Sequence, residues 1–351
     1  MTPSRPCFCS AAQTRSLIKH VGPPIHQCFS TVAPATLIVD TDVGFDDLLA
    51  ISALKSNRVA NVPFISTVGG MQDNPDRAAR YLKEIFPATL NVVAGDNTHL
   101  KNTHVENWLL ESRVLLDSLM DSEGVPKVSS NEESMSVNCA PMRIAEFLET
   151  HSGSVDLMCL GPLTNVASWI DHSEEILINK VQSIWIMGGN IPSKETREAE
   201  YNFKLDPLSM SKVIRHEKLR DKICIVPEQT CRRQIILNEK WNNIVNHGKK
   251  GDGVISKILA KNSDWNFLKY DAMCAFAYAN HDVCNGDEAA ICHEILRVCV
   301  DNNTGLLLQP SHEEMKDAIN IKFVTNISMN EEFGFPAWLS EAIRNEQSSY
   351  F

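Results

Sequence analysis

The sequence predicts an α/β protein, a single domain built on a mainly parallel open sheet flanked by helices. From Thr36 onward, short apolar runs rich in β-branched residues alternate with amphipathic helical stretches, which is the pattern of βαβ units. Glycines follow several of these runs, at Gly44, Gly69–Gly70, Gly161 and Gly188–Gly189. They are expected where the backbone turns tightly at the carboxyl edge of such a sheet.

The elements follow from the apolar periodicity. A first strand ends at Asp40, and the residues from Asp46 to Ser56 place their apolar side chains on one side of a helix. Further strands are predicted at 62–68, 91–94, 155–160, 183–187, 222–226, 306–308 and 319–327, and helices at 76–86, 108–120, 141–150, 163–170, 207–216 and 336–345. We expect an irregular excursion over 97–138 and a brief continuation of helical periodicity after Val283. Ligands of parallel sheets bind outside the carboxyl ends of the strands, so the site is expected there.

The bulk composition excludes several classes of function. Lys and Arg number 33 against 44 Asp and Glu, for a net charge of -11, so binding to nucleic acid or to an anionic membrane surface is not expected. No stretch approaches the roughly 18 to 20 apolar residues that span a bilayer. The 11 cysteines show no CxxC pair or zinc-type spacing, and only Cys7 and Cys9 lie close together. Most are predicted to be reduced core thiols.

The first 35 residues differ from the rest because they carry Arg5, Arg15 and Lys19 but no acidic residue. A basic, hydroxyl-rich and acid-free segment is typical of an organelle transit peptide, and a disordered extension without an address fits equally. We therefore predict an extension over 1–35 and one domain over 36–351. The protein is expected in the cytoplasm or, through the extension, in the mitochondrion or another organelle.

Four carboxylates fall within eight residues between Asp40 and Asp47, after an apolar strand and at the start of a helix. Like charges this close raise one another's pKa unless a cation or a helix dipole offsets them. A hard divalent ion with oxygen ligands, Ca²⁺ or Mg²⁺, is the natural partner. An EF-hand is excluded because Gly44 and Ile51 stand where that loop needs ligands.

Two other interpretations of this string stay open. In the first, Asp46 and Asp47 only stabilise the first turn of a surface helix as acidic capping residues. In the second, the string is the Asp-x-Asp of a haloacid-dehalogenase-like phosphatase, in which the first Asp attacks phosphorus. Those phosphatases also need a Lys and a later acidic pair, and nothing after Asp42 resembles their loop.

The string from Asp40 to Asp47 resembles the DxDxGxDD signature of inosine-uridine-type nucleoside hydrolases. Further motifs follow in the family's order: Thr67-Val68-Gly69-Gly70, Leu160-Gly161-Pro162-Leu163-Thr164-Asn165, Met187-Gly188-Gly189, Ala199-Glu200-Tyr201-Asn202-Phe203 with Asp206-Pro207, then Asp271, and a similar tail at 321–343. The shared order is more specific than any single motif. The resemblance, over about Thr36 to Arg344, implies hydrolysis of ribonucleosides to ribose and free base by a homo-oligomer, a dimer or tetramer.

The resemblance also implies a metal site. Carried over residue by residue, Asp42, Asp47 and Asp271 would bind Ca²⁺ together with the backbone carbonyl of Leu160. Asp42 would in addition be the general base on a calcium-bound water, which is reasonable because the ion lowers the pKa of that water. Asp40 would orient the loop from behind these ligands.

The sugar contacts are carried over in the same way. Asp46, Glu200, Asn202 and Asp271 would hold the ribose hydroxyls. Cleavage of an N-glycosidic bond passes through an oxocarbenium-like state, so carboxylates around the sugar stabilise the developing positive charge.

The sequence departs from the family pattern at three positions. Met71 stands where the family has an Asn that reaches the ribose, and Gln72 or Asn74 are the candidates to replace it. Tyr270 stands where a His protonates the leaving base, and a phenol is a poorer acid at neutral pH. Val43 replaces a Pro of the signature. The preference for purines or pyrimidines stays open, and so does the alternative of a catalytically weak relative that binds a nucleoside or calcium without turnover.

Overall fold

Strand β1 (Ala35–Thr41) lies inside the sheet, with strands that follow it in the chain on both of its sides. The structure is a computed structural model. It describes residues 34–86, 91–96, 107–122, 139–234, 236–282 and 289–348. Most of the predicted extension over 1–35, with Cys7 and Cys9, lies outside these residues. So do both ends of the predicted excursion over 97–138, whereas the helix predicted within it is present.

Within the described residues, nine strands form one sheet in the order β3-β2-β1-β4-β5-β6-β9-β7-β8. The remaining strands are β2 (Ala60–Thr67), β3 (Asn91–Ala94), β4 (Val155–Cys159), β5 (Val181–Met187), β6 (Ile223–Val226), β7 (Ile291–Val300), β8 (Leu307–Leu308) and β9 (Ile319–Ile327). Every pairing from β3 to β9 in this order is parallel, and only those made by β7 are antiparallel. The predicted fold class is confirmed.

The order of the strands creates a crevice beside β1. The chain runs outward from β1 through β2 to β3, then returns to the other side of β1 and continues through β4, β5 and β6. The connections after β1 and β4 therefore leave in opposite directions, which makes their carboxyl ends a ligand-binding switch point. Two backbone hydrogen bonds close the edge, from Val68 N to Thr41 O at 2.9 Å and from Leu160 N to Asp40 O at 2.8 Å.

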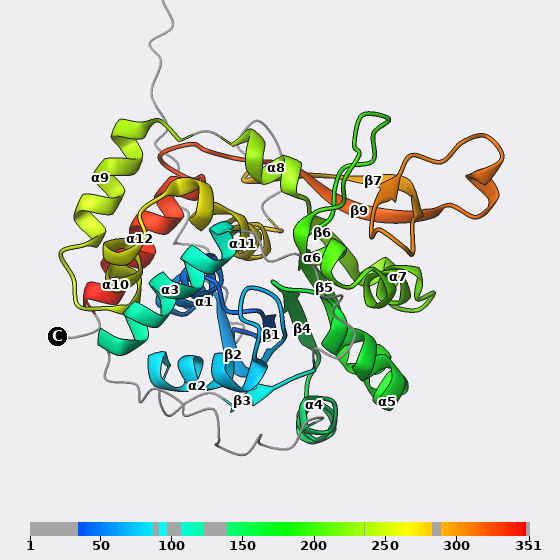
Figure 1. Cartoon of the computed structure of the whole chain (residues 1–351), viewed down its shortest axis with the longest axis horizontal. Coiled ribbons are helices and arrows are strands. Elements are labelled where there is room, and N and C mark those ends of the chain that lie inside the picture. Colours follow the sequence, from blue (N-terminus) through cyan, green and yellow to red (C-terminus); the bar gives the residue numbers. More distant parts are fainter. Residues whose placement is uncertain are drawn as a thin grey trace, which may run out of the picture. The chain divides into compact units, whose positions relative to one another are not determined.

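Helices cover both faces of the sheet (Figure 1). One face packs against α1 (Phe45–Ser56), α2 (Pro75–Ile85), α3 (Asn107–Ser122), α9 (Asn238–Gly248), α10 (Val254–Lys261), α11 (Trp265–Ala279) and α12 (Phe335–Ser348), and the other against α4 (Cys139–Thr150), α5 (Thr164–Lys180) and α7 (Pro207–Arg215). The short helices α6 (Tyr201–Leu205) and α8 (Glu228–Arg233) follow β5 and β6, and 3₁₀ turns occur at Arg220–Lys222 and Glu314–Lys316. No helix among the described residues is long and apolar enough to cross a membrane.

The strand period of two divides the core between these faces. In β1, Leu37 and Val39 join the core under α1 and α11, whereas Ile38 between them joins the core under α4 and α5. Such a strand is apolar throughout because both of its faces are buried. This explains why the first strand appears in the sequence as a continuous apolar run.

Helices α1 and α11 pack against each other in the interior. Both are apolar on nearly all sides, and α11 is buried almost continuously from Leu268 to Tyr278. A helix that is apolar all round is an interior helix. This packing brings Asp271 of α11 to the start of α1.

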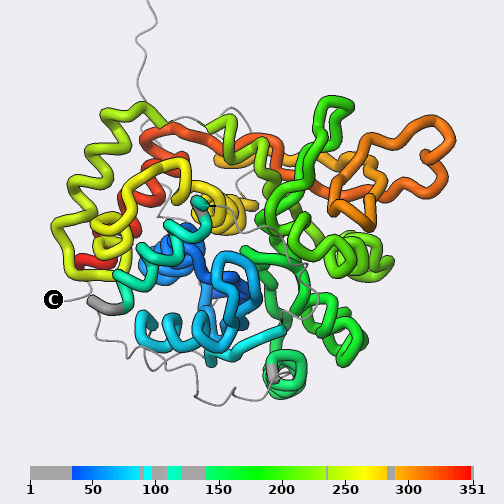
Figure 2. The backbone as a smooth tube through the Cα atoms, viewed as in Figure 1, coloured from blue at the N-terminus to red at the C-terminus, as the bar shows by residue number. Residues whose placement is uncertain are grey.

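One expectation is wrong. After Val283 the described chain does not continue as a helix but forms strand β7, which pairs along its length with β9. The two strands are the orange segments that run side by side in Figure 2. The local pattern does not reveal this strand, because pairing with a neighbouring strand decides the conformation. Residues 283–288 lie outside the described part.

Candidate active site

The carboxyl edge beside β1 opens into a cavity of about 930 Å³. Nearly all residues predicted for the site line it: Asp42, Asp46, Asp47, Leu160, Glu200, Asn202, Tyr270 and Asp271. They come from the ends of β1 and β4, the starts of α1 and α6, and α11. The exception is Asp40, which is fully buried in β1 below the cavity. The fold therefore brings the predicted residues together, although what each of them does is a separate question.

Asp42 is held against the turn that follows β2. Its Oδ2 accepts a hydrogen bond from Met71 N at 2.7 Å, and its own carbonyl accepts one from Gln72 N at 3.0 Å. A Cβ on Gly70 would lie 2.2 Å from Oδ2 of Asp42. Glycine at this position thus has a specific reason, because any side chain would push the carboxylate away.

Asp47 closes the loop at the start of α1. Its Oδ1 accepts a hydrogen bond from the Thr41 hydroxyl, and its Oδ2 accepts one from Gly44 N at 2.8 Å. This is the capping role considered from the sequence. Capping alone does not account for the site, since Asp47 is 1% exposed and faces other buried carboxylates.

Val43 takes a left-handed backbone conformation within this loop, with φ of 62°. A β-branched residue is rarely found there, and such strain is concentrated at functional sites. Proline fixes φ near −65° and could not adopt this conformation. The replacement of the signature proline therefore matches the path that this loop follows.

Three carboxylates converge at the floor of the cavity. The side chains of Asp46, Asp47 and Asp271 each offer an oxygen, and these oxygens all lie within 4.8 Å of one another. Asp42 adjoins the cluster through Asp47. The set differs from the predicted one in that Asp46 joins Asp47 and Asp271. The arrangement could hold a metal ion.

The electrostatics of the cluster favour a cation. Burial raises the pKa of Asp42, Asp46, Asp47 and Asp271, and the charges of neighbouring carboxylates raise it further in Asp42, Asp46 and Asp271. In the absence of a cation these groups are therefore protonated more readily than exposed aspartates. Oxygen ligands crowded in this way are the donor set that a hard divalent ion prefers, so the residues present fit such an ion.

Asp40 is fully buried in β1. Its Oδ1 accepts hydrogen bonds from Ser66 Oγ at 2.5 Å and Asn165 Nδ2 at 2.7 Å, whereas none of the described residues donates to its Oδ2. Burial raises the pKa of Asp40 to about 7. Asn165 also donates to Thr67 O at 3.0 Å, which ties the ends of β1 and β2 to α5.

Glu200 and Asn202 form the wall contributed by the start of α6, which follows β5. Glu200 caps α6, where its oxygens accept hydrogen bonds from Asn202 N and Gly189 N, both at 3.0 Å. Burial raises its pKa to about 7. The amide group of Asn202 donates to Leu160 O at 3.0 Å and to Met187 O at 3.2 Å. Leu160 O, the predicted main-chain ligand, therefore lies beside this wall.

The candidates to replace the missing asparagine do not reach the cavity. Among the described residues, Gln72 is fully buried with no hydrogen-bond partner for its side-chain amide, and Asn74 caps α2 by accepting from Arg77 N. Neither lines the cavity, whereas Met71 does. The turn after β2 thus contributes a backbone N–H to Asp42 and an apolar side chain to the wall.

Tyr270 lines the cavity one residue before Asp271 and interacts with α8 across it. Its hydroxyl hydrogen-bonds to Arg232, which pairs with Glu228 at 2.7 Å. Burial raises the pKa of Tyr270. Sequence reasoning missed these α8 residues and the exposed Phe267, although α8 directly follows the carboxyl end of β6, where lining residues are expected.

Fold and site together define an α/β protein with a buried carboxylate cluster at the switch point of a parallel sheet. The chain belongs to the inosine-uridine preferring nucleoside hydrolase family, whose model matches residues 37–331. Among curated relatives, the non-specific ribonucleoside hydrolase RihC of Salmonella agona is 27% identical over 182 residues, covering 51% of this chain and 57% of its own length. RihC of Klebsiella pneumoniae is 26% identical over 191 residues, 54% and 60% of the two chains. The matches thus span about three fifths of these relatives.

Solved structures share the fold over a longer stretch. The inosine-uridine preferring nucleoside hydrolase from Bacillus anthracis superimposes with a TM-score of 0.68 at 16% identity, covering 89% of this chain and 99% of that one. An inosine-guanosine nucleoside hydrolase gives 0.67 at 19% identity, covering 88% and 98%. At this identity the likeness establishes the fold alone.

We predict that the protein without metal ions loses stability as the pH rises. Asp40 and Glu200 have a pKa of about 7 in the folded chain and near 4 in an unfolded one, so the folded state binds more protons between these values. In chelator, the melting temperature should therefore be higher at pH 5.5 than at pH 8. Glu200→Gln should flatten the dependence, and the exposed Glu149→Gln should not. A melting temperature that rises over this interval in chelator would contradict the electrostatic account.

We also predict that Gly70→Ala disables the site. The added Cβ must displace the Asp42 carboxylate, which would lie 2.2 Å away, so the stabilisation of the fold by added Ca²⁺ should fall strongly. Gly153→Ala is the control because the nearest atom to its Cβ, Nε2 of His151, is 3.6 Å away. Equal shifts of the melting temperature by Ca²⁺ in the two variants would show that the close approach does not matter.

Proposed function

We propose that this protein hydrolyses the N-glycosidic bond of ribonucleosides to give ribose and a free base, with Ca²⁺ as its metal. The observation that carries the proposal is the convergence of buried carboxylates from β1, α1 and α11 on one cavity at the switch point. Family membership and the names of the relatives support the same reaction. A volume of about 930 Å³ is ample for a nucleoside.

In this proposal Asp42, Asp47 and Asp271 hold the ion with the carbonyl of Leu160. Asp46 lies close enough to Asp47 and Asp271 to contribute. When bound, Ca²⁺ would fix the attacking water and the ribose diol and lower the pKa of that water. Carboxylates rather than histidine or cysteine make this site suited to a hard ion.

Asp42 is proposed as the general base. It accepts the proton of the attacking water while the water oxygen bonds to the anomeric carbon and the bond to the base nitrogen breaks. The base leaves with the electron pair of that bond and takes its proton from solvent. The hydrogen bond from Met71 N keeps one carboxylate oxygen fixed, so the group does not need to reorient during the reaction. With Ca²⁺ offsetting the charges of the neighbouring carboxylates, Asp42 would be ionised and able to accept this proton.

Asp46, Glu200, Asn202 and Asp271 are proposed to bind the ribose hydroxyls. Both Glu200 oxygens already accept backbone N–H groups, yet a carboxylate has further lone pairs for a hydroxyl. The negative charges around the sugar favour the oxocarbenium-like transition state over the neutral nucleoside. Binding therefore contributes to rate as well as to affinity.

The proposed activity is tested by ribose release from a panel of purine and pyrimidine nucleosides, with and without chelator. We predict release from at least one nucleoside, lost in chelator and restored by Ca²⁺. Nucleoside binding without release from any member of the panel would favour a relative that binds without turnover. Ribose release that persists in chelator would show that the reaction does not require a metal ion.

We predict that Asp42→Asn lowers turnover by roughly 10²–10⁴-fold, the usual contribution of general-base catalysis. Nucleoside binding should weaken far less, since a base acts in the transition state. Asp171→Asn, on the exposed side of α5, is a matched control that should keep wild-type turnover. Turnover above about a tenth of the wild-type value in Asp42→Asn would remove Asp42 from this role.

Tyr270 is predicted to stack on the base rather than to protonate it. Burial moves its pKa further from neutrality, and Arg232 already bonds to its hydroxyl, whereas an aromatic face can pack on any base. Tyr270→Phe should then keep most of the activity and Tyr270→Ala should lose it. A severe loss of activity in Tyr270→Phe would show that the hydroxyl acts as a proton or hydrogen-bond donor. Wild-type activity in both variants would show that the nucleobase binds away from Tyr270.

A further inference from the structure

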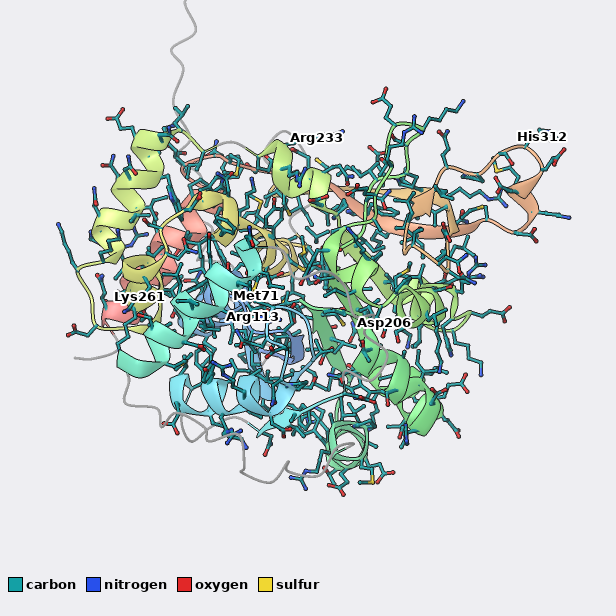
Figure 3. All side chains as sticks on the ribbon, in the orientation of Figure 1. Met71, Arg113, Asp206, Arg233, Lys261 and His312 are labelled. Carbon is teal, nitrogen blue, oxygen red and sulfur yellow. The ribbon has the colours of Figure 1, made fainter. Side chains whose placement is uncertain are left out.

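Arg113 of α3 clamps the turn that holds Asp42. Its guanidinium donates from Nε to Met71 O at 2.5 Å and from Nη2 to Gly70 O at 3.1 Å, and Nη1 lies 3.3 Å from Oδ2 of Asp73. Figure 3 shows Met71 and Arg113 next to each other. The Arg113 side chain is only 16% exposed, so its charge acts where water screens it weakly.

One peptide group links this clamp to Asp42. The carbonyl of Gly70 and the N–H of Met71 belong to the same planar unit. Arg113 holds the oxygen of that unit, and the N–H at its opposite side donates to Oδ2 of Asp42 at 2.7 Å. A cation on the carbonyl fixes the plane and polarises the peptide, which strengthens the hydrogen bond to the carboxylate.

The docking of α3 does not depend on Arg113 alone. Asp117 pairs with Arg77 and accepts a hydrogen bond from Tyr81 at 2.6 Å. Ser118 accepts one from Lys261 at 2.9 Å. The ion pair between Arg113 and Asp73 adds little, because the Asp73 side chain is 63% exposed. Other contacts therefore attach α3, and the hydrogen bonds from Arg113 to the two carbonyls are not needed for that purpose alone.

We propose that Arg113 is a positioning residue that fixes the orientation of the Asp42 carboxylate through the Gly70–Met71 peptide. The position of α3 is thereby coupled to the orientation of Asp42, the carboxylate proposed as both metal ligand and general base. The proposal rests on the role proposed for Asp42. It also explains why the side chain of Met71 can be apolar, since the turn serves Asp42 through its backbone.

The test compares Arg113→Met with Arg77→Met. Both variants remove a guanidinium that holds α3, but only Arg113 contacts the Gly70–Met71 peptide. Ca²⁺ affinity is measured by titration calorimetry on chelator-treated protein without nucleoside. We expect Arg113→Met to lose roughly 10–100-fold in affinity, the usual effect of removing a group that orients a metal ligand, and Arg77→Met to keep the wild-type value.

Kinetics give a second readout. Arg113→Met should lower kcat by a similar factor with KM little changed, because no sugar or base contact is removed. In the Asp42→Asn background Arg113→Met should add no further loss of Ca²⁺ affinity, since the effect passes through Asp42. Where Arg113→Met does not fold, Arg113→Lys replaces it and should show a smaller loss, because one ammonium cannot serve both carbonyls as a fork does.

Equal losses in Arg113→Met and Arg77→Met would overturn the proposal by showing that only helix docking matters. Wild-type Ca²⁺ affinity in Arg113→Met or Arg113→Lys, or a full additional loss in the Asp42→Asn background, would overturn it as well. Failure of the proposed hydrolysis is distinguishable. In that case the wild-type protein releases no ribose, while the Ca²⁺ titrations still decide the role of Arg113.

Discussion

The repulsion among carboxylates buried at one edge of the sheet is the constraint on which the site depends. Two unit charges 4 Å apart repel by about 4 kcal/mol at an effective dielectric constant of about 20, and hydrogen bonds to charged groups return only about 1.5–3 kcal/mol each. The three carboxylates of the cluster make three such pairs, so the donors from Thr41 and Gly44 to Asp47 cannot offset the repulsion by themselves. Either bound protons or a cation must offset the repulsion. The raised pKa of Asp46 and Asp271 shows that protons bind more readily when no cation is present. A cation relieves the same repulsion while leaving the carboxylates ionised for chemistry.

The surrounding structure keeps these groups in place despite the repulsion. Packing of α11 against α1 brings Asp271 to Asp46 and Asp47, and core burial on both sides of these helices makes that packing hard to rearrange. The turn after β2 holds Asp42, with Gly70 allowing the close approach and Arg113 fixing the peptide. Such support is what a preorganised site requires, because groups that relax on binding lose the advantage of their geometry.

Much of this was predictable from the sequence, and the remainder has physical reasons. The apolar run before Asp40 and the acidic string after it have local patterns, so the strand, the helix and a candidate metal site could be predicted directly. Asp271 could be joined to them only through the order of motifs, because the contact is made by packing of α1 and α11 and no local pattern encodes it. Strand β7 was misjudged because its conformation depends on pairing with β9. Arg113 was not predicted as a site residue, and Met71 was assessed by its side chain alone. The structure uses the backbone N–H and carbonyl of Met71, and the type of residue at a position does not reveal such backbone contacts.

The central claim is that the buried carboxylates exist to hold a hard cation, and the most direct test is titration of Ca²⁺ into chelator-treated protein by calorimetry. The measurement is repeated at one pH in two buffers that differ in ionisation enthalpy. Because the raised pKa of these carboxylates favours their protonation when no ion is bound, and ligands must be ionised to bind one, we predict one ion per chain and an apparent heat that changes with the buffer. Absence of binding at millimolar Ca²⁺, or binding whose heat is the same in both buffers, would contradict this account of the site.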